Sequence, residues 1–242
     1  MHIGEFIERS NRATTSGQLR DLLEKAALDQ GFDRFVYAVM NDGRMAPADE
    51  DLSAAVMLKF PEDWVKHYFE QGYQDHDPVI EYSPVTLAAY IWDELPLRFD
   101  LRPKQRRLLA EAREAGLKRG LSIPVHGPGG SLAIFSFASS EDDADPGAVV
   151  GHFQPLCTQF HVAYASLQGP LRIEVPRVEL TRRECECLSW VAQGKSSWDI
   201  GQILGITEFT VSYHVKKAMR KLGSGSRIVA VVKAIRLGLI QA

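Results

Sequence analysis

Apolar positions in the first two thirds of the chain follow two spacings, one typical of helices and one of buried strands. Leucines and alanines recur at helical spacing from Leu19 to Ala27, and the run FVYAVM at 35–40 predicts a buried strand. Further predicted elements are a helix with Pro61 in its first turn continuing to about Gln71, a short strand at 88–92, a helix at 103–115, strands at 121–125 and 132–138, and a long helix at 146–167. Helices around a mostly antiparallel sheet predict an α/β/α sandwich.

The long helix at 146–167 has an apolar stripe that allows two interpretations. Steps of four and three residues join Val149, Phe153, Leu156, Phe160, Ala163 and Leu167. Such a stripe either faces a core or forms a self-association seam, and we favour the core.

The last 60 residues carry helix-capping signals that separate four helices. Capping residues are Thr181 with Glu184, Ser196 with Asp199, and Thr207, while glycines end the helices at Gly194, Gly205, Gly223 and Gly238. The predicted helices start after Thr181 and span 197–204, 208–222 and about 226–237. A short helix, a tight turn at Gly205 and a longer basic helix form a helix-turn-helix pattern.

The third of these helices has one apolar and one basic face. At 100° per residue the inward arc holds Val211, Val215, Ala218 and Leu222, and the opposite side holds Ser212, Lys216 and Arg220 with Phe209 and Tyr213 beside them. The outward face is suited to base edges and phosphates in a major groove. The alternative is an amphipathic surface helix of a plain four-helix module, and the caps, the short partner helix and the local charge favour DNA binding.

Charge divides the 242-residue chain at the same place as its prolines. The net charge is −3, but residues 177–242 carry 11 Lys and Arg against 5 Asp and Glu, a local +6 that leaves −9 for 1–176. A basic end on an acidic body suggests a polyanionic partner, although a solvated charged face would give the same count. Prolines at 170 and 176 predict a linker at 168–179 between domains at 1–167 and 180–242.

Composition excludes several classes of protein. With 45% hydrophobic and 24% charged residues the chain is neither disordered nor collagen-like, and its apolar runs are shorter than the ~18 residues that a membrane helix needs. Cys157, Cys185 and Cys187 fit neither a disulfide framework nor a zinc site, so we expect free thiols, no metal and a cytoplasmic protein without membrane contact.

Residues of the carboxy-terminal segment resemble the LuxR-type DNA-binding domain. The matching residues are Leu180-Thr181-Arg182-Arg183-Glu184, Leu188, Gly194-Lys195, Ile200, Leu204, Thr210-Val211, His214 and Lys221-Leu222. NarL-type response regulators share this module, so the input domain decides the class. The first 167 residues have no receiver layout of a parallel sheet with a phosphorylatable aspartate.

A candidate small-molecule site lies in the first domain instead. Trp64 and Tyr68 share one face of the predicted Pro61 helix, and Asp77-Pro78 and Trp92 follow. Two indoles, a phenol and a carboxylate on an apolar sheet suit a mainly apolar ligand with a compact polar head. Each also has a structural explanation: the tryptophans as core fillers, Tyr68 as a partly exposed aromatic, and Asp77 as the N-cap of a helix starting at Pro78.

Together these residues resemble the autoinducer-binding domain of LuxR-type quorum-sensing regulators, which bind N-acyl homoserine lactones. The match comprises Phe60-Pro61-x-x-Trp64-x-x-x-Tyr68, Asp77-Pro78, Trp92, Ala115-Gly116-Leu117, Gly120-Leu121-Ser122-Ile123-Pro124 and Gly127. The resemblance implies that Trp64 donates to the lactone carbonyl, Asp77 accepts from the ligand amide, Tyr68 and Ser136 reach the acyl carbonyl, and Trp92 packs on the lactone ring. We expect the acyl chain among Val36, Ala38, Met40, Phe60, Val79 and Ile134.

The resulting prediction is a non-enzymatic transcriptional regulator without a cofactor. It would bind an N-acyl homoserine lactone as effector, dimerise, contact double-stranded DNA at an inverted repeat, and interact with RNA polymerase. Expected DNA contacts are Thr207, Thr210, Ser212, Tyr213, Lys216, Lys217 and Arg220. Three rivals stay open: a phosphorelay regulator, an enzyme using His67, His76 and Asp77 on the lactone, and a regulator answering another signal or none.

Overall fold

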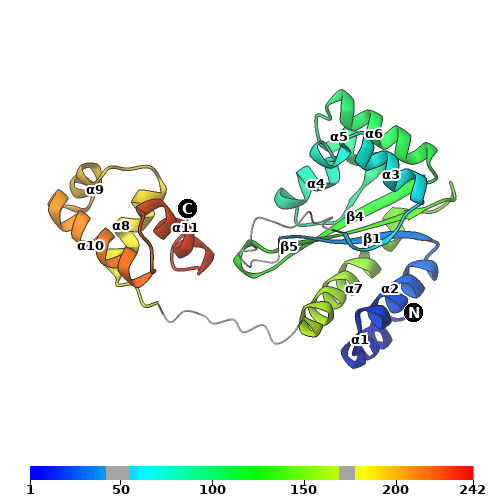
Figure 1. Ribbon diagram of the computed structural model, residues 1–242, viewed down its shortest axis with the longest axis horizontal. Coiled ribbons are helices and arrows are strands. Elements are labelled where there is room, and N and C mark those ends of the chain that lie inside the picture. Colours follow the sequence, from blue (N-terminus) through cyan, green and yellow to red (C-terminus); the bar gives the residue numbers. More distant parts are fainter. Residues whose placement is uncertain (42–54, 169–177, 242) are drawn as a thin grey trace. The chain divides into compact units, whose positions relative to one another are not determined.

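The computed structural model describes residues 1–41, 55–168 and 178–241, which form two compact units, Met1–Leu171 and Arg172–Ala242 (Figure 1). The predicted linker at 168–179 falls largely outside the described residues, at 169–177. Val178, at its carboxy-terminal end, already packs against the core of the second unit.

The described residues of the first unit are organised around an antiparallel sheet of five strands. Its strands are β1 Arg34–Asn41, β2 Ala55–Lys59, β3 Tyr90–Ile91, β4 Arg119–His126 and β5 Leu132–Ser139, in the order β2-β1-β5-β4-β3. Side chains alternate between the two faces along each strand. On β1, Phe35 and Tyr37 are therefore directed to one face and Val36 and Ala38 to the other.

Helices cover both faces, so the predicted α/β/α sandwich is confirmed (Figure 1). One face carries α1 Ile3–Arg12, α2 Ser16–Leu28 and α7 Pro146–Leu167, and the other carries α3 Glu62–Glu70, α4 Pro78–Tyr82, α5 Leu95–Arg98 and α6 Pro103–Glu114. The α7 stripe faces the core as favoured, because Val149, Phe153, Leu156, Phe160 and Ala163 are buried in the main hydrophobic cluster.

Three local differences separate the structure from the sequence prediction. The strand expected at 88–92 is only Tyr90–Ile91, because the chain turns into a 3-10 helix at Trp92–Glu94 and the edge strand pairs with β4 alone. Pro61 is the N-cap of α3 rather than a first-turn residue. Helices α1 and α5 and strand β2 were not predicted, and all three are short elements whose apolar residues pack against other parts of the chain.

The described residues of the second unit, 178–241, form four helices, as predicted: α8 Arg182–Ala192, α9 Ser197–Leu204, α10 Glu208–Lys221 and α11 Arg227–Arg236. The caps form as expected, since the side chains of Thr181, Ser196 and Thr207 each accept a backbone N–H three residues on. Gly205 ends α9 with φ +66°, the left-handed conformation that glycine adopts without strain. The apolar face of α10 is buried, with Val211, Val215, Ala218 and Leu222 in the unit's two hydrophobic clusters.

Within the described ranges, no helix is both long and apolar enough to cross a membrane. The three cysteines are free thiols.

Candidate ligand cavity and nucleic-acid interface

A cavity of about 770 Å³ lies in the first unit, on the sheet face that α3 to α6 cover. This volume falls within the range of small-molecule sites, about 300 to 1,000 Å³. All eleven residues expected to contact a ligand line it: Val36, Ala38, Met40, Phe60, Trp64, Tyr68, Asp77, Val79, Trp92, Ile134 and Ser136. The structure thus brings together residues that are up to 100 positions apart.

Further lining residues were not predicted from the sequence. They are Leu58, Val65, Phe69, Gln74, Ile80, Leu108, Leu109, Ala112 and Leu117. Helical spacing offered one signal, because Val65 and Phe69 are four apart and adjoin Trp64 and Tyr68, while Leu108 and Ala112 are four apart on α6. Nothing in the sequence indicated that α6 and β2 face the same space as α3.

Asp77 both caps helix α4 and lines the cavity. One carboxylate oxygen accepts from the backbone N–H of Val79 at 2.7 Å and so caps α4, while the other accepts from the Tyr68 hydroxyl at 2.8 Å. Burial raises the pKa of Asp77, although these hydrogen bonds favour the charged form, and burial also raises the pKa of Tyr68. The cavity wall therefore holds a desolvated carboxylate whose position is fixed by two donors.

Trp92 is held against the sheet by a chain of polar groups. Its indole N–H donates to Ser122 Oγ at 2.8 Å, and Ser122 Oγ lies 2.9 Å from Ser136 Oγ. Gly120 makes room for this ring, since a Cβ atom there would lie 2.3 Å from Trp92 Cε3. Ser136 lines the cavity, so this series of hydrogen bonds ends at a hydroxyl group in the cavity wall.

The α3 helix and the turn that follows it are tied to α6 around one carboxylate. Glu111 accepts from the Tyr73 hydroxyl at 2.6 Å, lies 2.7 Å from His67 Nε2, and accepts from Arg107 Nε at 2.6 Å. Hydrogen bonds, that from Tyr73 foremost, lower the pKa of Glu111 to about 2. This network anchors the helix that carries Trp64, whose side chain is 5% exposed.

The Trp64 indole remains available to the cavity. The ring packs in a small cluster with Tyr73, Leu108 and Leu117. No described residue accepts a hydrogen bond from its indole N–H, and Trp64 is a lining residue.

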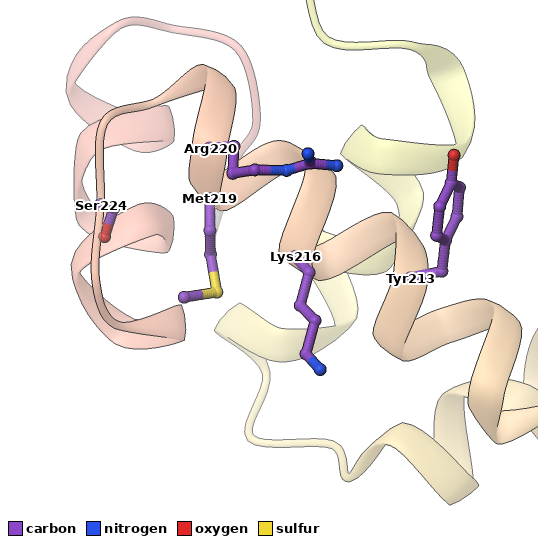
Figure 2. A pocket seen from close by; sticks show the side chains of 5 residues that line it. All are labelled: Tyr213, Lys216, Met219, Arg220 and Ser224. Carbon is purple, nitrogen blue, oxygen red and sulfur yellow. The ribbon is translucent and has the colours of Figure 1, made fainter.

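In the second unit, α10 presents the basic face expected of a recognition helix (Figure 2). Lys216 and Arg220 are exposed, Tyr213 is half-exposed, and Lys217 Nζ lies 5.7 Å from the centre of the Tyr213 ring. Tyr213, Lys216 and Arg220 border a shallow cleft of about 340 Å³ with Met219 and Ser224 (Figure 2).

Two of the predicted DNA contacts also take part in the helix cap. The Thr207 hydroxyl accepts from the Thr210 backbone N–H at 3.1 Å, and the two threonine hydroxyls lie 2.8 Å apart. Their free hydrogen-bonding capacity is correspondingly smaller than that of Ser212.

Two family models match the chain. The autoinducer binding domain matches residues 15–164, and the luxR family of bacterial regulatory proteins matches residues 178–234. Among curated relatives, the putative HTH-type transcriptional regulator y4qH of Sinorhizobium fredii is 34% identical over 100% of this chain and 74% of its own length. The quorum sensing-dependent regulator RpaR of Rhodopseudomonas palustris is 40% identical over 75% and 73%, and the activator LuxR of Aliivibrio fischeri is 32% identical over 77% and 75%.

Solved structures agree with the fold. SdiA in complex with octanoyl-rac-glycerol aligns with a TM-score of 0.58 at 24% identity, over 98% of this chain and 94% of its own. Escherichia coli SdiA in a second crystal form gives the same TM-score and identity over 99% and 98%. At this identity the likeness bears on the fold alone.

Proposed function

The chain belongs to the luxR family of bacterial regulatory proteins and joins an autoinducer-binding domain to a helix-turn-helix DNA-binding domain, and from this premise we propose that its effector is an N-acyl homoserine lactone. Proteins that combine these two domains are quorum-sensing transcriptional regulators and not enzymes. The autoinducer-binding match also argues against a phosphorelay regulator, because this input domain is not a receiver domain.

The observation that carries the proposal is the Asp77–Tyr68 pair in the wall of an otherwise mainly apolar cavity. A desolvated carboxylate forms a strong, charge-assisted hydrogen bond with an N–H donor, and the amide of an acyl homoserine lactone offers one such N–H. The amide is therefore expected to bind at Asp77.

The other polar groups fit the remaining oxygens of the same molecule. The indole N–H of Trp64 donates to the lactone carbonyl, and the Ser136 hydroxyl donates to the acyl carbonyl. Tyr68 has a single O–H, which donates to Asp77 in the structure; on binding it turns to the acyl carbonyl while the ligand amide takes its place at Asp77. Trp92, held by Ser122, packs against the lactone ring. The acyl chain extends along the apolar lining residues Val36, Ala38, Met40, Phe60, Val79 and Ile134.

The domain organisation follows from this assignment. Residues 1–167 bind the autoinducer, 168–179 form the linker, and 180–242 bind DNA through Thr207, Thr210, Ser212, Tyr213, Lys216, Lys217 and Arg220. Ligand binding completes the first domain's core, stabilises a homodimer and aligns two α10 helices on an inverted repeat of double-stranded DNA. The dimer acts in the bacterial cytoplasm on the chromosome and contacts RNA polymerase there.

Thermal unfolding of the ligand-free protein with a panel of N-acyl homoserine lactones tests the effector class. A ligand that binds only the folded state stabilises it by RT ln(1 + [L]/Kd), about 2.7 kcal/mol at a hundredfold excess over Kd. Homoserine lactone without an acyl chain and the free fatty acids serve as controls, because each supplies only half of the recognised chemistry. If no member of the panel raises the melting temperature above these controls, the effector assignment fails.

Mass spectrometry of organic extracts gives an independent check. The protein is expressed in cells supplied with a mixture of N-acyl homoserine lactones, purified and extracted. Recovery of one lactone at close to one equivalent per chain is the expected result and also gives the acyl-chain length. Recovery of a different compound class would replace the proposed effector.

A further inference from the structure

An exposed aromatic side chain stands at the start of α10. Phe209 is 82% exposed and belongs to neither hydrophobic cluster of the second unit. Exposing a phenylalanine in this way gives the folded domain no stabilisation from the ring. Its position on the DNA-facing side of the helix-turn-helix suggests a use in recognition instead.

The helix places this ring in line with the basic residues. At 100° per residue, Phe209, Tyr213, Lys216 and Arg220 fall within an arc of about 60°. Along the axis the stripe changes character: the aromatic residues occupy the amino-terminal half and the cations the carboxy-terminal half. Because recognition helices present their amino-terminal residues to base edges, the aromatic half meets the bases and the cations meet phosphates.

The hydrogen-bonding groups in that first half carry little base information. Ser212 pairs with any base, and the Thr210 hydroxyl is already 2.8 Å from that of Thr207. The bidentate pairings that identify a base use Arg or Lys on guanine and Asn or Gln on adenine. The first turns of α10, Glu208 to Tyr213, contain no Arg, Lys, Asn or Gln.

One further feature of base edges matches an exposed phenyl ring. Thymine alone among the DNA bases carries a methyl group in the major groove, and apolar side chains including Phe contact it. We propose that Phe209 reads thymine, its ring packing on thymine 5-methyl groups so that the protein selects T by apolar contact. With a rise of 1.5 Å per residue, Tyr213 stands about 6 Å further along the axis, close to two base steps.

The test removes the methyl group and nothing else. Full-length protein, purified both with and without mixed N-acyl homoserine lactones in the growth medium, first selects its site from a random-sequence duplex library. Each thymine of the selected site is then replaced by deoxyuridine, and binding is followed by fluorescence anisotropy. Neither step depends on which effector the first domain binds.

The expected result is a position-specific loss for the wild type. Removing one contacted methyl should weaken binding about fourfold, the ratio that corresponds to about 0.8 kcal/mol per methyl-sized group, and two half-sites of a dimer should give about fifteenfold. Phe209→Ala should bind thymine and uracil duplexes equally, and Phe209→Leu should keep part of the preference. Lys216→Ala should weaken both duplexes alike and keep the ratio, because it contacts phosphate.

Three outcomes would overturn the inference. The wild type could bind every uracil-substituted site as tightly as the thymine site, or Phe209→Ala could keep the wild-type preference for thymine. Either result would leave DNA binding intact and refute thymine reading alone. Failure to enrich any sequence would refute both sequence-specific DNA binding and the role of Phe209. Melting curves of Phe209→Ala should match the wild type, since the ring is 82% exposed.

Discussion

Replacing Asp77 by asparagine separates the structural role of this residue from its proposed role in ligand binding. The amide oxygen of Asn can still accept from the Val79 N–H, so the cap of α4 is kept. The amide nitrogen then occupies the place of the oxygen that accepts from Tyr68 at 2.8 Å. A ligand amide N–H would then face the NH2 group of the introduced asparagine, which is also a donor, where the wild type offers the carboxylate oxygen of Asp77 as an acceptor.

Without ligand the substitution should not destabilise the protein. Burial raises the pKa of Asp77, which means that the folded state disfavours its charge. The cost of that charge is absent below the unfolded pKa, about 3.9, and grows as pH rises through the folded value. The ligand-free Asn variant should therefore be at least as stable as the wild type at pH 7 and lose this advantage below about pH 4.

With ligand the effect should reverse. A hydrogen bond to a charged group contributes about 1.5 to 3 kcal/mol, so its loss weakens ligand affinity about 10- to 150-fold. At a ligand concentration of about 100 times the wild-type Kd, stabilisation falls from about 2.7 to about 0.3–1.4 kcal/mol. At about 2 to 4 °C per kcal/mol, a shift of about 5 to 11 °C should fall to about half or less.

Paired melting curves of the wild type and the variant, with and without lactone, measure both effects. Asp75→Asn is a matched control, because Asp75 is exposed and lies two residues away. The reasoning is refuted if Asp77→Asn keeps the full ligand-induced shift. A variant that unfolds without ligand would instead show that the carboxylate is needed for the fold.

Three further predictions test other parts of the molecule. Gly120→Ala should displace Trp92, since the new Cβ would lie 2.3 Å from its ring. Urea unfolding should show a stability lower by about 1 to 3 kcal/mol, and the ligand should no longer stabilise the variant. An unchanged stability and ligand response would contradict the close contact between Gly120 and Trp92. Glu111→Gln should destabilise the protein at pH 7, with the difference from wild type vanishing as pH falls from about 5 toward 2, because the folded pKa is about 2 and the unfolded one about 4.3; a difference independent of pH would argue against the charged network. Lys216→Ala and Arg220→Ala should each reduce the slope of log binding constant against log salt by about 0.9, and an unaltered slope would place the phosphate contacts elsewhere.

Local patterns were enough to predict the second unit. Each of its helices is marked by a cap such as Thr181 and a closing glycine such as Gly205, and these act through hydrogen bonds within a few residues. The helical period also predicted which side of α10 is buried. The first unit was harder, because β2 is a short edge strand paired only with β1 in the described residues.

The candidate cavity shows the same division. Spacing of four residues put Trp64 and Tyr68 on one helix face, and Asp77 and Trp92 were candidates by residue type. The other seven of the eleven expected lining residues followed from the family resemblance. The Trp92–Ser122–Ser136 chain was not predicted, since it joins a 3-10 helix to two neighbouring strands. Its formation depends on the β4–β5 register, which pairs Ser122 with Ser136.

By itself the sequence determined the period and ends of the four carboxy-terminal helices, the acidic and basic parts of the chain and the two family resemblances. These features depend on residues close together or on order along the chain. The tertiary structure alone decided that Asp77 meets Tyr68 and that Gly120 admits the Trp92 ring. These contacts join separate elements, and their energies depend on distances of a few ångströms that sheet order and helix packing set.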